Sequence, residues 1–344
     1  MRFHLAPFTF AVLVLINPNN ASAVPLSPIQ EQQAGQKPAV SATALLKAAE
    51  QGDAKAQCAL ATAYFLGRAV QQDYAEAARW FRKAADQNDA LAQANLGLMY
   101  YSGWGFPQDY AEALHWYRKS ADQGNSAAQN GLGAMYATGK GIKQDFAEAA
   151  RWYRGAADQG YSNAQFNLGV MYANGRGVKQ DYAAAVRWYR QAAEHDHIDA
   201  QYNLALLYSS GKGIAQDLAE AAKWFAKVAE QGDAEAQYNL GAMYSSGKGV
   251  AQDYPEAAKW YRKAAVQGNA DAQRNLGELL ADGKGVTRDH IQAYMWLTLS
   301  ASGAKGKRRD EVTGLRNSIA GKMTSQQIGE AQRLAKEWKP DKAK

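Results

Sequence analysis

A serine precedes a lysine by three residues in the sequence YSSGKGVAQDY, at Ser245 and Lys248. This is the spacing of the serine nucleophile and lysine in penicillin-recognising enzymes, and Ser209 and Lys212 repeat it one unit earlier. Here a helical pattern ends at the serine and Gly247 intervenes, so we expect the lysine to point into a loop. The partner sequences Ser-Asp-Asn and Lys-Thr-Gly are missing, and we therefore predict no catalytic residues in this loop.

The same loop has two of the glycines that a phosphate-binding loop would need. Gly241 and Gly247 enclose five residues, whereas that motif has four before its Gly-Lys-[Ser/Thr]. Gly249, which has no hydroxyl group, follows Lys248, and the loop follows a predicted helix where the motif requires a strand. The register and the context both exclude this kind of nucleotide site.

The sequence EHDHIDA at 194–200 is the strongest candidate for a metal site. Its ligands would be His195, Asp196, His197 and Asp199. It replaces a Gln-Gly turn that most other units share, and two histidines two residues apart need further preorganised ligands. A polar turn is the favoured interpretation, and we expect neither a metal nor a cofactor.

The N-terminus has the pattern of a secretory leader. A charged start and a short apolar run ending at Ile16 precede a small-residue cleavage pattern ending at Ala23. The run is too short to span a bilayer of about 30 Å. We predict a leader over 1–23, a flexible linker over 24–41, and an exported protein, periplasmic in a Gram-negative bacterium or alternatively secreted.

Charge and cysteine content narrow the classes of partner. The net charge is +6, and residues 304–344 alone carry 11 Lys/Arg against 5 Asp/Glu, so the rest of the chain is nearly neutral. Nucleic-acid binding is disfavoured because it needs basic residues clustered along a surface. The basic tail could instead make weak contact with an anionic envelope surface. Cys58 is the only cysteine, which excludes an intrachain disulfide.

One sequence unit is written seven times with a constant period of 36 residues. The pair Ala-Gln begins at 56, 92, 128, 164, 200, 236 and 272, and tryptophan stands at 80, 116, 152, 188, 224, 260 and 296. Each unit shows two helical patterns, with a glycine after the first, an aspartate before the second, and in most units a glutamate that predicts a capping box. Two such short helices cannot bury their aromatic residues alone, and stacked copies can.

These patterns predict an all-α, right-handed α-solenoid of seven 36-residue repeats with capping helices at both ends. A concave surface would be lined mainly by the first helices. The predicted divisions are a leader (1–23), a linker (24–41), an N-terminal capping helix (42–55), the seven repeats (56–307), and C-terminal capping helices with a basic tail (308–344).

The unit AQYNLGAMYSSGKGVAQDYPEAAKWYRKAAVQGNAD resembles the Sel1-like repeat, a relative of the tetratricopeptide repeat. The segments AYMWLTLSASG and KMTSQQIGEAQRLAKEW are similar to the closing segment of many bacterial members. The resemblance implies an adaptor that holds other proteins together. Some exported members are associated with β-lactam binding or weak hydrolysis, so a β-lactam- or cell-wall-related protein is the alternative. Those members have paired cysteines within each repeat, which this chain lacks.

Two adjacent positions of the first helix are the candidates for binding a protein or peptide partner. One changes from unit to unit, and the next is asparagine in five units. If they face the concavity, aromatic rings could pack an apolar partner and side-chain amides could bond an extended backbone. The predicted binding residues are Phe166, Tyr202, Tyr238, Arg274, Asn167, Asn203 and Asn239. The alternatives are packing between helices for the aromatic residues and a role in the repeat frame for the asparagines.

Overall fold

The computed structural model describes residues 42–340, and every helix or strand element in that range is an α-helix. The predicted leader, the linker and residues 341–344 lie outside these described residues. The chain divides into two compact units at Asp181, inside the fourth repeat. None of the helices between residues 42 and 340 is long and apolar enough to cross a membrane.

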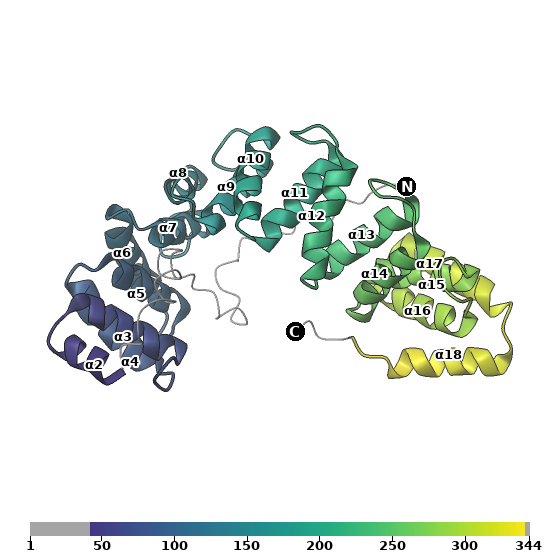
Figure 1. Cartoon of the computed structure of the whole chain (residues 1–344), viewed down its shortest axis with the longest axis horizontal. Helices are drawn as coiled ribbons and strands as arrows, with labels where there is room; N and C mark the ends of the chain where they lie inside the picture. Colours follow the sequence, from purple (N-terminus) through teal and green to yellow (C-terminus); the bar gives the residue numbers. More distant parts are fainter. Residues whose placement is uncertain (1–41, 341–344) are drawn as a thin grey trace. The chain divides into compact units, whose positions relative to one another are not determined.

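Unit 1 is built from eight helices over its described residues (Figure 1). They are α2 (Ala42–Glu50), α3 (Ala54–Leu66), α4 (Tyr74–Asp86), α5 (Ala90–Ser102), α6 (Tyr110–Asp122), α7 (Ser126–Thr138), α8 (Phe146–Ala157) and α9 (Ser162–Asn174). Each helix from α2 to α8 packs against the next one along the chain, so first and second helices of the repeats alternate through the unit. Helix α2 occupies the place of a second helix before the first repeat.

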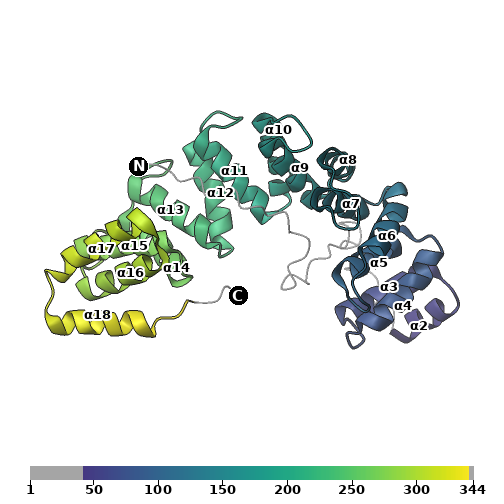
Figure 2. The same ribbon diagram turned by 180° about the vertical axis from the view of Figure 1, so that it is seen from behind.

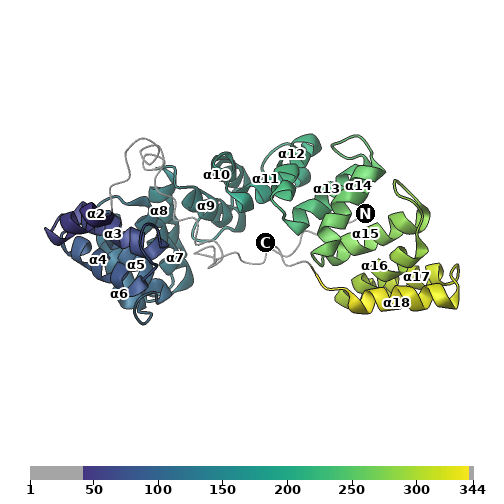
Figure 3. The ribbon, with the colours of Figure 1, turned by 60° about the horizontal axis from the view of Figure 1, so that its bottom comes forward.

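Unit 2 continues the alternation and ends with two helices outside the repeats (Figure 2). Its helices are α10 (Tyr182–Glu194), α11 (Ile198–Ser210), α12 (Leu218–Glu230), α13 (Ala234–Ser246), α14 (Tyr254–Val266), α15 (Ala270–Asp282), α16 (His290–Gly303), α17 (Gly306–Ala320) and α18 (Ser325–Glu337). Both α17 and α18 pack against α16, the second helix of the seventh repeat (Figure 3). They cover an apolar side of α16 with residues such as Val312 and Ala331, which are buried.

Local capping explains where the helices of each repeat begin and end. The first helix of the sixth repeat ends at Gly247, whose φ of 68° is left-handed, as a C-terminal cap requires. The second helix begins after Asp253, whose carboxylate accepts a hydrogen bond of 2.9 Å from the N–H of Glu256. Gly249 completes the loop at φ 78°, and a Cβ there would collide with the carbonyl oxygen of Leu218 in the preceding repeat.

The predicted capping boxes of the second helices are wrong in one respect. The aspartates cap, but the glutamates three residues later bond elsewhere: Glu148 and Glu256 pair with Arg151 and Lys259, and Glu112 accepts from the indole N–H of Trp116. A cation or an indole one turn along the helix competes for the same carboxylate. A reciprocal box forms instead at the start of α18, between Thr324 and Gln327.

The buried frame has the same side chains in both units. One leucine of every first helix is at most 2% exposed: Leu60, Leu96, Leu132, Leu168, Leu204, Leu240 and Leu276. The glutamine of each Ala-Gln pair donates its side-chain N–H to an alanine carbonyl eight residues earlier, as Gln237 does to Ala229 at 3.0 Å. In several repeats it also accepts from a glutamine thirty residues later, as Gln237 does from Gln267 at 2.9 Å. These buried bonds join each helix to the helices beside it, which fixes the repeat geometry.

Candidate functional site: the first-helix face of unit 2

The partly exposed side of α11, α13 and α15 carries an acidic residue and a large side chain that differ from the corresponding residues of unit 1, beside an asparagine that most repeats share. We call it the first-helix face of unit 2, and none of its side chains is fully buried. Its residues are Asp199, Tyr202, Asn203, Glu235, Tyr238, Asn239, Asp271, Arg274 and Asn275. Residues three or four apart on a helix share one side, so each helix contributes an acidic residue, a large side chain and an amide.

One of the two candidate positions of the first helix changes from repeat to repeat, and we call it the variable position. It is buried in unit 1 and partly exposed in unit 2. Its residues in unit 1 are all buried: Cys58, Ala94, Asn130 and Phe166. Phe166, a predicted binding residue, is only 2% exposed and belongs to the core of its unit. Tyr202, Tyr238 and Arg274 of unit 2 are each half-buried. The structure therefore leaves the unit 2 members of the predicted set accessible.

Tyr202 is anchored at its ring and at its hydroxyl. The ring meets Phe225 of α12 edge-on, with 5.7 Å between ring centroids. The hydroxyl accepts a hydrogen bond of 3.3 Å from the side-chain amide of Asn239 on the next first helix. Burial, and the negative charges of Glu235 and Asp233, raise the pKa of Tyr202 to about 12. The phenol is therefore neutral and available as a hydrogen-bond donor.

Tyr238 occupies the same position one repeat later. Its ring lies beside Tyr261, with 6.1 Å between centroids. Burial raises the pKa of Tyr238, while the positive charge of Arg308, on α17 of the C-terminal cap, opposes that rise. The two tyrosines thus stand in neighbouring repeats, each with its ring supported from behind by an aromatic residue of a second helix.

The asparagines of this position bind neighbouring repeats together, as their role in the frame would require. Asn239 bonds to Tyr202, and in unit 1 Asn167 donates to Asn130 at 3.1 Å. Asn203 is half-buried and lies at the same position on α11. The amides of Asn167 and Asn239 are thus already used in part by contacts within the chain.

The second residue of each first helix, which we call position two, is acidic in unit 2, and the sequence analysis did not single it out. In unit 2 its residues are Asp199, Glu235 and Asp271, whereas in unit 1 they are Lys55, Leu91, Ala127 and Asn163. Reading this position down the seven aligned units would have shown the change, because the acidic residues are grouped in the last three. Burial raises the pKa values of Asp199 and Glu235, and the nearby carboxylate of Asp233 raises them further.

Two arginines meet carboxylates on this face. Arg308 on α17 forms an ion pair with Asp271 of α15. Arg274 pairs with Glu278 one turn along its own helix, at 2.9 Å between Nε and Oε1. The predicted binding residue Arg274 is therefore neutralised locally, and Arg308 brings the C-terminal cap onto the face.

The loop of Ser245 and Lys248 has the geometry of a turn. Ser245 lies in the last turn of α13 with its side chain near Tyr261, and its carbonyl accepts from the side-chain amide of Gln252 at 2.9 Å. Lys248 lies beyond the Gly247 cap, and its main-chain N–H donates to the carbonyl of Met243. The serine therefore contacts the frame, and the cap separates it in sequence from the lysine.

The histidine-rich segment also acts as a helix cap. His197 is the N-cap of α11, and its Nδ1 accepts from the N–H of Ala200 at 3.3 Å. Asp196 adopts the left-handed conformation that glycine or asparagine has at the same place in other repeats. Burial lowers the pKa of His197. No group of three or more metal-ligating side chains occurs between residues 42 and 340.

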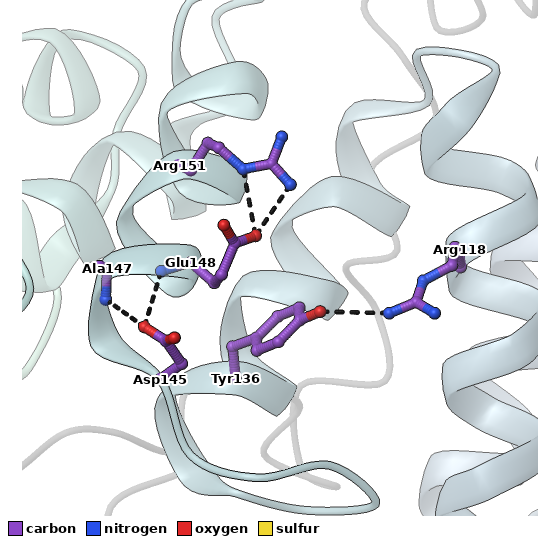
Figure 4. A network of polar contacts seen from close by, with 6 residues as sticks. All are labelled: Arg118, Tyr136, Asp145, Ala147, Glu148 and Arg151. Carbon is purple, nitrogen blue, oxygen red and sulfur yellow. Dashed lines mark hydrogen bonds and ion pairs between the residues drawn. The ribbon is translucent and has the colours of Figure 1, made fainter.

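A second polar surface, in unit 1, holds its partners within the chain (Figure 4). Arg118 donates to the hydroxyl of Tyr136 at 3.1 Å, and Glu148 holds Arg151 at 2.8 Å. The Asp145 carboxylate caps α8 through the N–H groups of Ala147 and Glu148. These side chains are satisfied by their neighbours, so we place this network in the frame.

The family model of the Sel1 repeat matches seven consecutive stretches of the chain. They are 54–89, 90–125, 126–161, 162–197, 198–233, 234–269 and 270–304. The chain belongs to the Sel1 repeat family. Proteins of this family are typically non-catalytic scaffolds that mediate protein–protein interaction. The predicted resemblance and the all-α solenoid fold are thereby confirmed.

Two solved structures of the same class of repeat protein are similar to the chain. A Sel1 repeat protein from Oxalobacter formigenes is 38% identical, with a TM-score of 0.60, over 80% of this chain and 79% of that one. A protective antigen of uropathogenic Escherichia coli strains, which displays the same class of repeat, is 33% identical over 86% of this chain and 78% of that one, with a TM-score of 0.41. None of the curated proteins compared with the chain matches it.

Proposed function

We propose that this Sel1 repeat protein is an exported, non-catalytic scaffold that binds a protein or peptide partner through the first-helix face of unit 2. The observation that carries the proposal is the opening of that face: the variable position is buried throughout unit 1 but presents Tyr202 and Tyr238 in unit 2. Tyrosine supplies large contact area at a small loss of side-chain entropy, and it is enriched among the residues that dominate binding energy.

The surroundings of the two tyrosines support this role. Each ring is held by an aromatic neighbour, so little conformational freedom remains to be lost on binding. The hydroxyl of Tyr202 can still donate a hydrogen bond, because its bond with Asn239 uses the oxygen as the acceptor. A polypeptide backbone offers carbonyl acceptors of the matching kind.

Capture of partners tests the site. Full-length protein and a Tyr202→Ala/Tyr238→Ala variant would be cross-linked in cells of the source organism, and bound proteins would be quantified by mass spectrometry. We expect the amount of the principal partner captured by the variant to fall at least about tenfold, which corresponds to the loss of one strong contact pair. A matched Leu91→Ala/Leu98→Ala variant changes the same helix face in unit 1 and should retain the partner. Equal capture by the tyrosine variant and the wild type would refute the assignment of the face.

Export is tested separately. The proposal rests on the leader pattern of 1–23, which lies outside the described residues. We expect a mature N-terminus at Val24 and recovery from the periplasmic fraction. A full-length N-terminus on protein recovered from the cytoplasm would contradict export and leave the binding proposal intact.

A further inference from the structure

The first-helix face of unit 2 repeats one arrangement of side chains three times, and the copies differ in whether a cation pairs with the acidic residue. Asp199, Glu235 and Asp271 stand at equivalent positions of consecutive repeats, 36 residues apart. A large side chain follows each of them three residues later, on the same side of the helix. The three repeats can therefore be compared as three copies of one site.

The seventh repeat shows what this arrangement binds. The guanidinium of Arg308, carried by α17, forms an ion pair with Asp271, and its charge also acts on Glu235 and Tyr238. Helix α17 lies outside the repeats and packs on α16, so it reaches the face as a separate segment of chain would. A cationic side chain from outside the repeat thus occupies one copy of the arrangement.

The fifth repeat has no equivalent of Arg308, and in the sixth repeat Arg308 acts on Glu235 without forming an ion pair with it. Between residues 42 and 340, a lysine or arginine forms an ion pair with Asp271 but with neither Asp199 nor Glu235. Glu235 accepts from the neutral amide of Asn269 at 2.8 Å. His197 is the nearest titratable base to Asp199 in sequence; burial lowers its pKa, and the Asp199 carboxylate opposes that shift. With Asp233 between them, these two copies carry a local excess of negative charge.

The tyrosines add a second feature that suits a cation. Tyr202 lies within the electrostatic influence of Asp233 and Glu235, and Tyr238 within that of Glu235 and Arg308. The face of a phenol ring attracts a guanidinium, and burial of one side of the ring strengthens the attraction. A carboxylate beside a supported aromatic ring is a combination that selects arginine over a neutral side chain.

Building on the proposed function, we infer that the first-helix face of unit 2 docks a polypeptide segment rich in arginine or lysine. Its cationic side chains bind at Asp199 and Glu235 beside Tyr202 and Tyr238, as Arg308 of the chain itself binds at Asp271. Charge complementarity carries the inference. Unit 1 offers no such site, because its position-two residues are Lys55, Leu91, Ala127 and Asn163.

The spacing of the copies suggests the probe. Packed helices lie about 8–10 Å apart, and a polyproline-II segment, with three residues per turn and a rise of about 3.1 Å per residue, returns every third side chain to the same side after about 9 Å. A suitable probe is therefore a fluorescein-labelled peptide with arginine at every third position and serine and leucine between. The control peptide has citrulline in place of arginine, which keeps the shape and removes the charge.

Fluorescence anisotropy with the full chain gives the test. We expect the arginine peptide to bind at least about tenfold more tightly than the citrulline peptide, and Asp199→Asn/Glu235→Gln to remove most of this preference. The matched control is Glu220→Gln/Glu256→Gln, which removes two charges from exposed i,i+3 pairs on second helices of the same unit. This control should change the affinity by less than about twofold.

Three results would overturn the inference: equal affinity for the two peptides, an unchanged affinity in the Asp199/Glu235 variant, or an equal loss in the control variant. Circular dichroism and thermal melts of all variants separate loss of binding from loss of fold. Failure here is distinguishable from failure of the proposed function. If the tyrosine variant loses its cellular partner while the arginine peptide shows no preference, the face binds partners but does not select cations.

Discussion

Unit 1 and unit 2 share one frame and differ on one face. In both, a buried leucine and a left-handed glycine recur at the same positions of every first helix, and the glutamine of the Ala-Gln pair is buried in every repeat but the third. At the variable position, however, unit 1 ends with the buried Phe166 and unit 2 begins with the half-buried Tyr202, in the very next repeat. The difference shows that a repeat protein can change its surface chemistry from one repeat to the next while the packing that fixes its geometry stays constant.

The largest expected effect is a difference in stability loss between alanine substitutions at the variable position of unit 1 and of unit 2. Phe166→Ala should destabilise unit 1 by about 3–5 kcal/mol, because it removes a buried ring and leaves a cavity. Tyr202→Ala should cost unit 2 less than half as much, because its ring is partly exposed already. Hydrogen exchange measured repeat by repeat is the appropriate readout, since long arrays need not unfold in one step. Equal losses of protection would show that the two positions do not differ in burial.

The next effect concerns Arg308, the cation that the chain itself places on the first-helix face of unit 2. Arg308→Gln should free the Asp271 carboxylate and tighten binding of the arginine peptide by about threefold, the size of an exposed ion pair. Arg309→Gln is the matched control, because it removes the same charge from an exposed neighbour in sequence. Anisotropy titrations at low and high salt would show whether the gain is screened as an ion pair must be. Weaker binding in Arg308→Gln would mean that this arginine supports the face and does not compete for it.

A smaller effect follows from the raised pKa values of Asp199 and Glu235. A carboxyl whose pKa is higher in the folded state favours folding in its neutral form, so its unfavourable contribution appears as the pH rises through its unfolded value. Asp199→Asn and Glu235→Gln should therefore leave the protein as stable at pH 7, or more stable by a few tenths of a kcal/mol. Urea denaturation at pH 7 and at a lower pH would test this, and the difference should shrink as the pH falls. A clear loss of stability at pH 7 would show that these carboxylates serve the frame.

The repeat frame could be predicted from the sequence, whereas the first-helix face of unit 2 could be predicted only in part. The 36-residue period, the Asp253 cap and the turn at Gly247 follow from spacing and local backbone preferences, which neighbouring repeats reinforce. The burial of Phe166 could not be read from the same pattern, because an aromatic residue at that position fits both a core and a surface. Tyr202 and Phe166 are chemically alike, and the residues packed around each decide its exposure.

The acidic residues at the second position of α11, α13 and α15 were missed for a different reason. A single glutamate or aspartate in the first turn of a helix has a local explanation in the helix dipole, and each of Asp199, Glu235 and Asp271 can be explained in that way. Their significance lies in comparison across repeats and in the ion pair with Arg308. That pair joins residues from separate elements and cannot be inferred from the spacing within one unit.

The smallest expected effect is at the loop whose spacing resembles a serine–lysine active site. Ser245→Ala removes a hydroxyl that contacts the Tyr261 side chain, and Lys248→Ala removes an exposed side chain, so each should change stability by less than about 0.5 kcal/mol. Neither should alter binding of the arginine peptide, because the loop lies at the opposite end of α13 from Glu235. A fluorescent penicillin should label wild type and Ser245→Ala equally and weakly. Covalent labelling that disappears in Ser245→Ala would instead place chemistry in the loop and make unit 2 more than a binding surface.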